Sequence, residues 1–192
     1  MINRNVDARS LKIDQRELAS RLGQPYGASV DTYRGLYEEL LLAAKPSYVA
    51  MRVKLNRENG GITVGKMTSH STALGKLTDG CDFMMILVAT LGIGVDRLLL
   101  KKAHTSALEA FIIDALADAL VEALCDLAEK ESCEGFLATP RFSPGYADLE
   151  LSLGAEIIAL CGADKTLGIK MSQSGLMIPK KSVNALVAIR NA

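Results

Sequence analysis

The sequence predicts an α+β fold: a single domain in which a twisted antiparallel sheet packs beside one long buried helix and several shorter helices. Residues 48–55 alternate in polarity, as a half-buried strand does. Residues 82–89 are apolar without alternation, which is typical of a strand buried on both faces. Residues 105–131 contain no Gly or Pro and are rich in Ala and Leu, which favours a single long helix.

The remaining elements follow from shorter patterns. Apolar residues at helical spacing predict short helices over residues 14–22, 31–44, 69–76 and 151–161, and a further helix that begins at Asp96. Strands are expected at 62–64, 136–138, 167–171 and 183–189. Residues 1–30 are polar with scattered apolar pairs, so we expect an N-terminal arm or cap there and the main domain over residues 31–192.

Composition excludes several classes of partner. Lys and Arg together number 22, as do Asp and Glu, so the formal charge is zero and no nucleic-acid footprint is expected. The pairs Lys101-Lys102 and Lys180-Lys181 are interpreted as solvated charge. The longest purely apolar run, residues 83–89, is too short to cross a bilayer. The N-terminus lacks the apolar core of a signal peptide, so a cytoplasmic protein without membrane association is expected.

Metal and nucleophile chemistry is poorly represented. The four cysteines form no C-x-x-C pair and there are only two histidines, which predicts reduced thiols and no protein-bound metal. Cys125 and Cys161 lie among apolar residues and are interpreted as core. Neither His70 nor His104 belongs to a nucleophile motif, so no catalytic residue is predicted.

Acidic residues recur every four positions along the long helix, at Asp114, Asp118, Glu122 and Asp126. This spacing keeps them on one helical face. The simplest interpretation is a solvated stripe on an otherwise buried helix, and we adopt it for all but Glu122.

The most informative stretch is Arg141-Phe142-Ser143-Pro144-Gly145-Tyr146, which precedes a second distinctive run over residues 172–183. Pro and Gly favour a turn, and Gly lets a backbone approach a ligand closely. An arginine fork can bind both oxygens of a carboxylate. From the residues alone, a ligand-binding loop and an ordinary turn with a solvated arginine both remain open.

Arg141-x-x-x-Gly145-Tyr146, followed by Ser-Gly-Leu-Met-Ile-Pro-Lys-Lys-Ser-Val at residues 174–183, resembles the activation domain of cobalamin-dependent methionine synthase, here in a stand-alone form. Residues 81–97 and 114–123 fit the same family, so the resemblance covers about residues 30–192.

The resemblance implies an S-adenosylmethionine site. Arg141 would bind the carboxylate of the methionyl part, and the backbone around Ser143 and Gly145 would contact the ligand. Tyr146 would pack on the ligand or donate a hydrogen bond, although a core aromatic with a satisfied hydroxyl is equally compatible with the residues. Glu122 would meet the amino group or a ribose hydroxyl.

Two further residues lie in the second motif. Ser174 and Met177 would line the site or belong to the strand and turn that support it. For the N-terminal acidic contact of the family, Asp31 is the one candidate.

The implied function is the reactivation of cobalamin-dependent methionine synthase. Inactive cob(II)alamin needs one electron, here from a flavodoxin- or ferredoxin-like donor, and a methyl group from S-adenosylmethionine. Cobalt is the nucleophile and the sulfonium is an activated leaving group, so the protein would act by positioning, without a general base. Because no cobalamin-binding module is present, the chain would act in trans on a methionine synthase that lacks its own activation domain. It ends at Ala192, soon after the second motif, which leads us to expect a less covered ligand.

Two alternatives stay open. The chain could be a non-catalytic docking or regulatory module for a corrinoid protein that has lost S-adenosylmethionine binding. It could also be an unrelated small-molecule enzyme built around Thr90-Leu91-Gly92, which would require a pocket lined by residues 90–96, far from Arg141. Gly92 and Gly94 lack the third glycine of a dinucleotide-binding loop, so a tight turn is the preferred interpretation.

Overall fold

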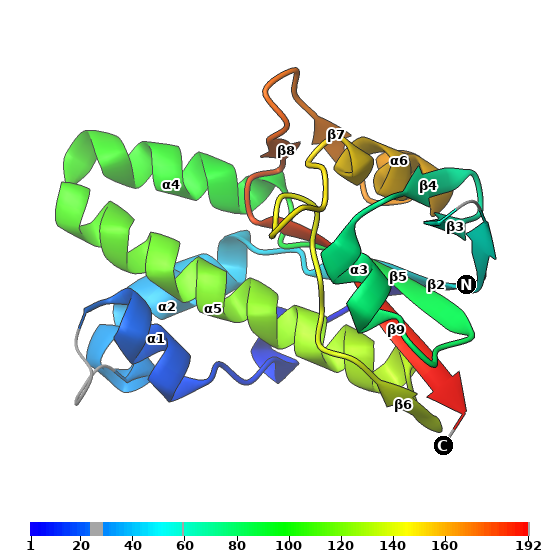
Figure 1. Cartoon of the computed structure of the whole chain (residues 1–192). Coiled ribbons are helices and arrows are strands. Elements are labelled where there is room, and N and C mark those ends of the chain that lie inside the picture. Colours follow the sequence, from blue (N-terminus) through cyan, green and yellow to red (C-terminus); the bar gives the residue numbers. More distant parts are fainter. Residues whose placement is uncertain (24–28, 59, 192) are drawn as a thin grey trace.

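The computed structural model describes residues 1–23, 29–58 and 60–191. Its strands are β1 (Ile2–Asn5), β2 (Ser47–Glu58), β3 (Gly61–Val64), β4 (Met67–Ser69), β5 (Phe83–Thr90), β6 (Phe136–Ala138), β7 (Lys170–Met171), β8 (Met177–Ile178) and β9 (Ser182–Asn191). The main sheet has the order β4-β3-β2-β5-β9-β6, every pairing is antiparallel, and β1 pairs with β2 (Figure 1). β7 and β8 form a separate hairpin.

The helices are α1 (Gln15–Arg21), α2 (Arg34–Ala43), α3 (Thr72–Leu77), α4 (Ile93–Thr105), α5 (Ala107–Ser132), α6 (Leu153–Leu160) and α7 (Ala163–Thr166), with 3-10 turns at Ala8–Ser10 and Val30–Tyr33. α5 has 26 residues and carries most of one core layer. The predicted α+β class, with an antiparallel sheet beside one long helix, is therefore confirmed. None of these described helices combines the length and apolar character needed to cross a membrane.

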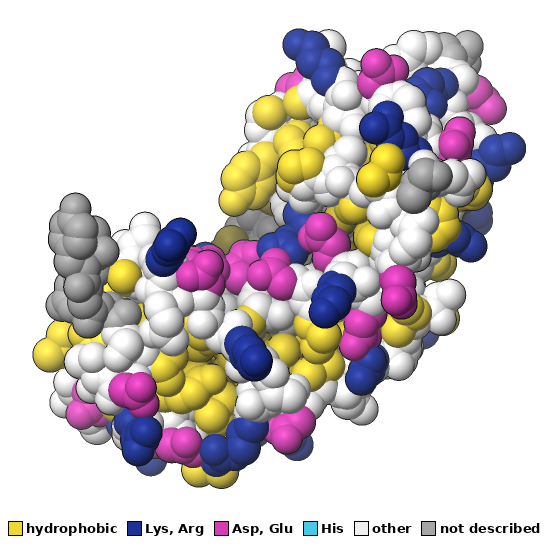
Figure 2. Space-filling model, turned by 90° about the horizontal axis from the view of Figure 1, so that it is seen from below, with side chains coloured by type: hydrophobic (Ala, Val, Ile, Leu, Met, Phe, Trp, Pro, Cys, Tyr) yellow, Lys and Arg dark blue, Asp and Glu magenta, His cyan; other side chains and the backbone are white. Residues whose placement is uncertain are grey.

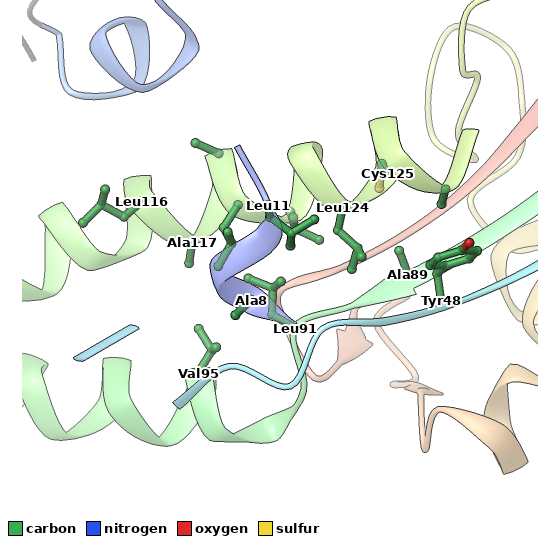
Figure 3. Packing of buried hydrophobic residues seen from close by; sticks show 14 of the residues in the cluster. Ala8, Leu11, Tyr48, Ala89, Leu91, Val95, Leu116, Ala117, Leu124 and Cys125 are labelled. Carbon is green, nitrogen blue, oxygen red and sulfur yellow. The ribbon is translucent and has the colours of Figure 1, made fainter. Parts of the chain in front are cut away.

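Helices cover both faces of the sheet. On one face, α1, α2, α4 and α5 pack against alternate residues of β2, β5 and β9. Figure 3 shows Leu124 of α5 pointing toward Ala89 and Tyr48 of this face. On the other face, α3 and α6 cover the intervening residues, such as Val88 and Leu186. β5 and β9 are thus buried on both sides along most of their length, which explains the apolar run in β5.

Some elements differ from the sequence prediction. β2 is buried on both faces over Ser47–Ala50 and alternates only further along, because the helices around α5 cover only the start of the strand, whereas the opposite face stays covered as far as Leu55. The helix predicted over residues 69–76 begins at Thr72, since residues 67–69 pair with β3 as an edge strand. The strand predicted over residues 167–171 shortens to β7, because Leu167 still closes the last turn of α7.

The N-terminal segment packs on the same core as the rest of the chain. β1 pairs with β2, and Ala8, Leu11 and Leu18 are buried in the layer around α5. Residues 24–28 of the predicted arm lie outside the described residues. All four cysteines are free and buried, in line with the core interpretation of Cys125 and Cys161.

Candidate functional site

A cleft of about 530 Å³ lies between α5 and the segment that follows β6. Figure 1 shows this segment, drawn in yellow, crossing α5, and Figure 2 shows acidic and basic side chains gathered at the base of a notch in the surface. The residues that line the cleft are Glu122, Asp126, Glu129, Pro140, Arg141, Phe142, Ser143, Tyr146 and Val183.

The cleft segment is held against the edge of the sheet. The Thr139 N–H donates to the carbonyl of Ala188 (2.9 Å), and Phe142 and Leu186 exchange two backbone hydrogen bonds of 2.9 Å each. These bonds continue the β6–β9 pairing past the end of β6. Arg141 therefore leaves the sheet edge at a fixed position beside α5.

Arg141 faces three carboxylates of α5. Its Nη1 donates to Asp126 Oδ1 (2.7 Å) and Glu129 Oε2 (2.9 Å), and its Nη2 donates to Glu122 Oε2 (3.0 Å). Partial burial acts to lower the pKa of the Arg141 guanidinium, but its hydrogen bond to Asp126 and the surrounding charges outweigh burial and raise the pKa. One permanent cation thus lies in a wall that carries three acidic groups.

The second half of the acidic stripe is also paired. Lys181 Nζ lies 2.8 Å from Asp114 Oδ1 and 2.6 Å from Asp118 Oδ1, and its side chain is only 9% exposed. Arg21 of α1 reaches Asp118 at 3.2 Å. These acids do form a partly solvated stripe, with Asp114 52% and Asp118 32% exposed, but they are also paired with cations. The interpretation of Lys181 as solvated charge is wrong. Segments distant in sequence bring cations to this helical face.

Tyr146 lies at the rim of the cleft. It is 68% exposed, so its interpretation as a core aromatic is wrong. The turn before it depends on Gly145, which has a φ of 92°, a region that side chains disfavour. A Cβ on Gly145 would also lie 3.2 Å from Leu151 Cδ1.

The two sequence motifs meet at Leu151, and the second motif contributes only its last residue, Val183, to the cleft lining. A Cβ on Gly175, in the second motif, would lie 2.7 Å from Leu151 Cδ2. Ser174 and Met177 line a neighbouring hollow of about 550 Å³ at the β7–β8 hairpin. The structure therefore brings Glu122, Arg141, Ser143 and Tyr146 together and places Ser174 and Met177 in the adjacent hollow.

Other candidate residues have local explanations. Asp31 pairs with Arg34 at 3.1 Å and its side chain is 81% exposed. Gly92 caps α4 with a φ of 81°, and a Cβ on Gly94 would overlap the carbonyl oxygen of Ala43. Backbone conformation accounts for Gly92 and close packing accounts for Gly94, so the interpretation of this turn as an active site gains no support.

Sequence reasoning missed two residues of the cleft wall. Asp126 and Glu129 follow Glu122 by four and seven positions, a spacing that places all three on one helical face. That spacing was a usable signal. Within residues 1–23, 29–58 and 60–191, no cluster of three or more His, Cys, Asp or Glu side chains is arranged to hold a metal ion.

No protein-family model and no curated protein sequence matches the chain. Among solved structures, it is similar to the crystal structure of the MetH reactivation domain bound to AdoHcy, with a TM-score of 0.74 and 20% sequence identity. The similarity covers 97% of this chain and 77% of that one. The chain therefore has the fold of that reactivation domain, the fold that the sequence resemblance implied.

Proposed function

We propose that the protein binds S-adenosylmethionine in the cleft beside Arg141 and presents its methyl group to cobalamin on a partner methionine synthase that lacks an activation domain. It would support reductive methylation of cob(II)alamin, with the electron from a flavodoxin- or ferredoxin-like donor. One observation carries the proposal. Glu122, Arg141, Ser143 and Tyr146 line one cleft, in a fold shared with a reactivation domain whose crystal structure contains AdoHcy.

The charges of the cleft suit this ligand. S-adenosylmethionine carries one carboxylate and two cationic centres, the ammonium and the sulfonium. The cleft offers one guanidinium to the carboxylate and an acidic wall to the two cations. Charges in a partly desolvated cleft attract more strongly than in bulk water.

Binding would require an exchange of ion pairs. The ligand carboxylate must replace at least one acidic group on Arg141, and Asp126 is the most accessible of them at 70% exposure. An exposed ion pair contributes little net stability, so Asp126 can turn into solvent at low cost. The fork of Arg141 then becomes available while Glu122 and Glu129 stay in place to meet the cationic part of the ligand.

The chemistry itself asks little of the protein. The sulfonium is already an activated leaving group, and the cobalt of the bound partner supplies the nucleophile. The residues of this chain would hold the ligand and aim its methyl group out of the open cleft, which is catalysis by positioning. The protein would thus be an accessory part of a methyltransferase whose active site is shared with its partner.

A second candidate function is a docking or regulatory module for a corrinoid protein that does not bind S-adenosylmethionine. The observation that favours it is the state of Arg141, because both of its terminal nitrogens are already engaged by carboxylates. In this case the cluster around Arg141 would be a structural ion-pair network. Partner binding would then be independent of S-adenosylmethionine.

The test is calorimetric titration of the purified protein with S-adenosylmethionine. We expect saturable binding by the wild type, none by Arg141→Ala, and weaker binding by Arg141→Lys, which keeps the charge but loses the planar fork. Arg9→Ala is the matched control, since Arg9 forms an exposed ion pair with Glu38 and does not line the cleft. Circular dichroism of each variant would verify folding.

The contrary outcomes are distinct. Undiminished binding by Arg141→Ala would refute the site. If the wild type binds only when a cobalamin-loaded methionine synthase fragment is present, the partner completes the site. If S-adenosylmethionine does not bind either with or without that fragment, the docking or regulatory module remains as the supported function. With a reductant, conversion of cob(II)alamin to methylcobalamin, followed by absorbance, would test the reaction directly.

A further inference from the structure

Asp148 fastens the loop after Arg141 to the start of α3. Its Oδ1 accepts hydrogen bonds from the Ser71 hydroxyl (2.5 Å) and the Ala73 N–H (3.2 Å). Its Oδ2 accepts from the Thr72 N–H (2.7 Å) and from the Thr72 hydroxyl. These donors, the Ser71 hydroxyl first among them, hold the pKa of the Asp148 carboxyl well below its usual range.

The loop over residues 143–148 connects two fixed residues, Phe142 and Leu149. Phe142 is hydrogen-bonded in both directions to β9, and Leu149 is buried at 2% exposure. Between them the backbone turns through two left-handed residues, Gly145 with a φ of 92° and Ala147 with a φ of 50°. A non-glycine residue in this region is strained and persists only when its surroundings hold it there.

Pro144 is buried, so packing holds the first part of the loop, but few contacts are available to hold residues 145–148. The Gly145 N–H donates to the Leu149 carbonyl (2.8 Å) and the Tyr146 N–H donates to the Ser143 carbonyl (3.2 Å), but these bonds lie within the loop. Among the described residues, the hydrogen bonds that tie residues 143–148 to another element are those of Asp148. Tyr146 is exposed, so packing does not fix its place either.

We infer that Asp148 is a positioning residue for the ligand site. By clamping the loop onto α3 it holds Ser143 and Tyr146 where the ligand meets them, although Asp148 itself does not line the cleft. The inference rests on the proposed function. A loop that is ordered in advance spares the ligand the entropic cost of ordering it, so the clamp raises affinity without any contact to the ligand.

The test weakens the contact between Asp148 and α3 by replacing either the acceptor, Asp148, or a donor, Thr72. Asp148→Asn keeps the shape but replaces one accepting oxygen. Thr72→Val removes the α3 hydroxyl that donates to Asp148, at a residue that does not line the cleft. We expect each to weaken S-adenosylmethionine binding by about tenfold in calorimetry. Each should also speed amide exchange over residues 143–149 in the unliganded protein, measured by mass spectrometry. The double variant should lose less than the product of the single effects, because both act on one contact.

A matched control separates positioning from general stability. Asp14→Ala removes another helix-capping carboxylate, which accepts from the Arg16 N–H (2.8 Å) at the start of α1. It should lower the unfolding midpoint and leave ligand affinity unchanged. If the two clamp variants bind as the wild type does, or Asp14→Ala binds as weakly as they do, this inference is overturned while the proposed function stands. If the wild type binds no S-adenosylmethionine, alone or with the partner, the proposed function falls and the positioning role falls with it.

Discussion

The ammonium of Lys181 lies 2.6 Å from the carboxylate of Asp118, which joins the start of β9 to the middle of α5 across 63 positions of sequence. The same ammonium lies 2.8 Å from Asp114 Oδ1, so it is shared by two carboxylates. Although the lysine is almost fully buried, both carboxylates keep contact with water. The ammonium of Lys181 therefore lies on the buried side of the acidic stripe and offsets part of the negative charge of Asp114 and Asp118.

Replacing Lys181 should destabilise the fold. Lys181→Ala leaves Asp114 and Asp118 facing each other without their shared cation, and we expect a loss of about 1–2 kcal/mol because the carboxylates remain partly hydrated. Urea denaturation measures this loss. Lys180→Ala is the control, since Lys180 is exposed and should change stability by less than about 0.5 kcal/mol. Equal effects of the two variants would contradict the role assigned to Lys181.

Gly94 should tolerate no side chain. In Gly94→Ala the new methyl group would overlap the carbonyl oxygen of Ala43, so α2 and α4 must separate, and we expect a loss of about 3 kcal/mol or more. Gly75→Ala in α3 is the matched control because nothing lies within 4 Å of its Cβ position. That variant should gain about 0.5–1 kcal/mol from helix propensity. Thermal unfolding of the pair would decide, and a stable Gly94→Ala would show that this packing is looser than described.

Tyr48 should make stability fall at high pH. Burial, together with the hydrogen bond to Glu131, raises the pKa of Tyr48 to about 12. A raised folded pKa means that its contribution is complete below the unfolded value of about 10 and is lost as pH rises toward 12. Urea midpoints between pH 9 and pH 12 should therefore fall less steeply for Tyr48→Phe than for the wild type. The chain contains five Tyr, so the difference in tyrosinate absorbance between the wild type and Tyr48→Phe reports the titration of Tyr48. Parallel curves for the two proteins would refute this assignment.

Asp148 should make stability fall at low pH, in contrast to Tyr48 at high pH. The hydroxyl of Ser71 and the donors of Thr72 depress the pKa of Asp148 in the folded protein. Its contribution is therefore present above the unfolded pKa of about 4 and is lost as pH falls below it. The difference in unfolding midpoint between wild type and Asp148→Asn should stay nearly constant from pH 6 to pH 5 and shrink as the pH is lowered through about 4 and below. A difference that stays constant with pH would mean that the charge of Asp148 does not stabilise the fold.

Local signals in the sequence were enough to predict most of the fold. The apolar run of β5 and the helix-favouring composition of α5 depend on neighbours a few positions away, so pattern alone identifies them. The limits of β2 and α3 were less predictable. They depend on which helix covers a strand and on an edge pairing with β3, and both are tertiary contacts.

Part of the candidate site could also be predicted from the sequence. Arg141, Ser143, Gly145 and Tyr146 are neighbours in one motif, so they were found as a group. The addition of Glu122 depended on resemblance to a known family. The role of Asp148 could not be predicted from the sequence, because its partners Ser71 and Thr72 lie more than seventy positions earlier in the chain.

Periodicity and turn chemistry are local properties of the chain, so the residues alone were enough to predict the α+β class, the long helix and the motif around Arg141. The tertiary structure settled that the acids of α5, although partly solvated, are also paired with cations. It did so by bringing Arg141 along the β6–β9 edge and Lys181 to the start of β9, each opposite the same helical face. Charge pairing depends on distance in space, and the spacing of residues along one helix carries no information about a cation that arrives from elsewhere.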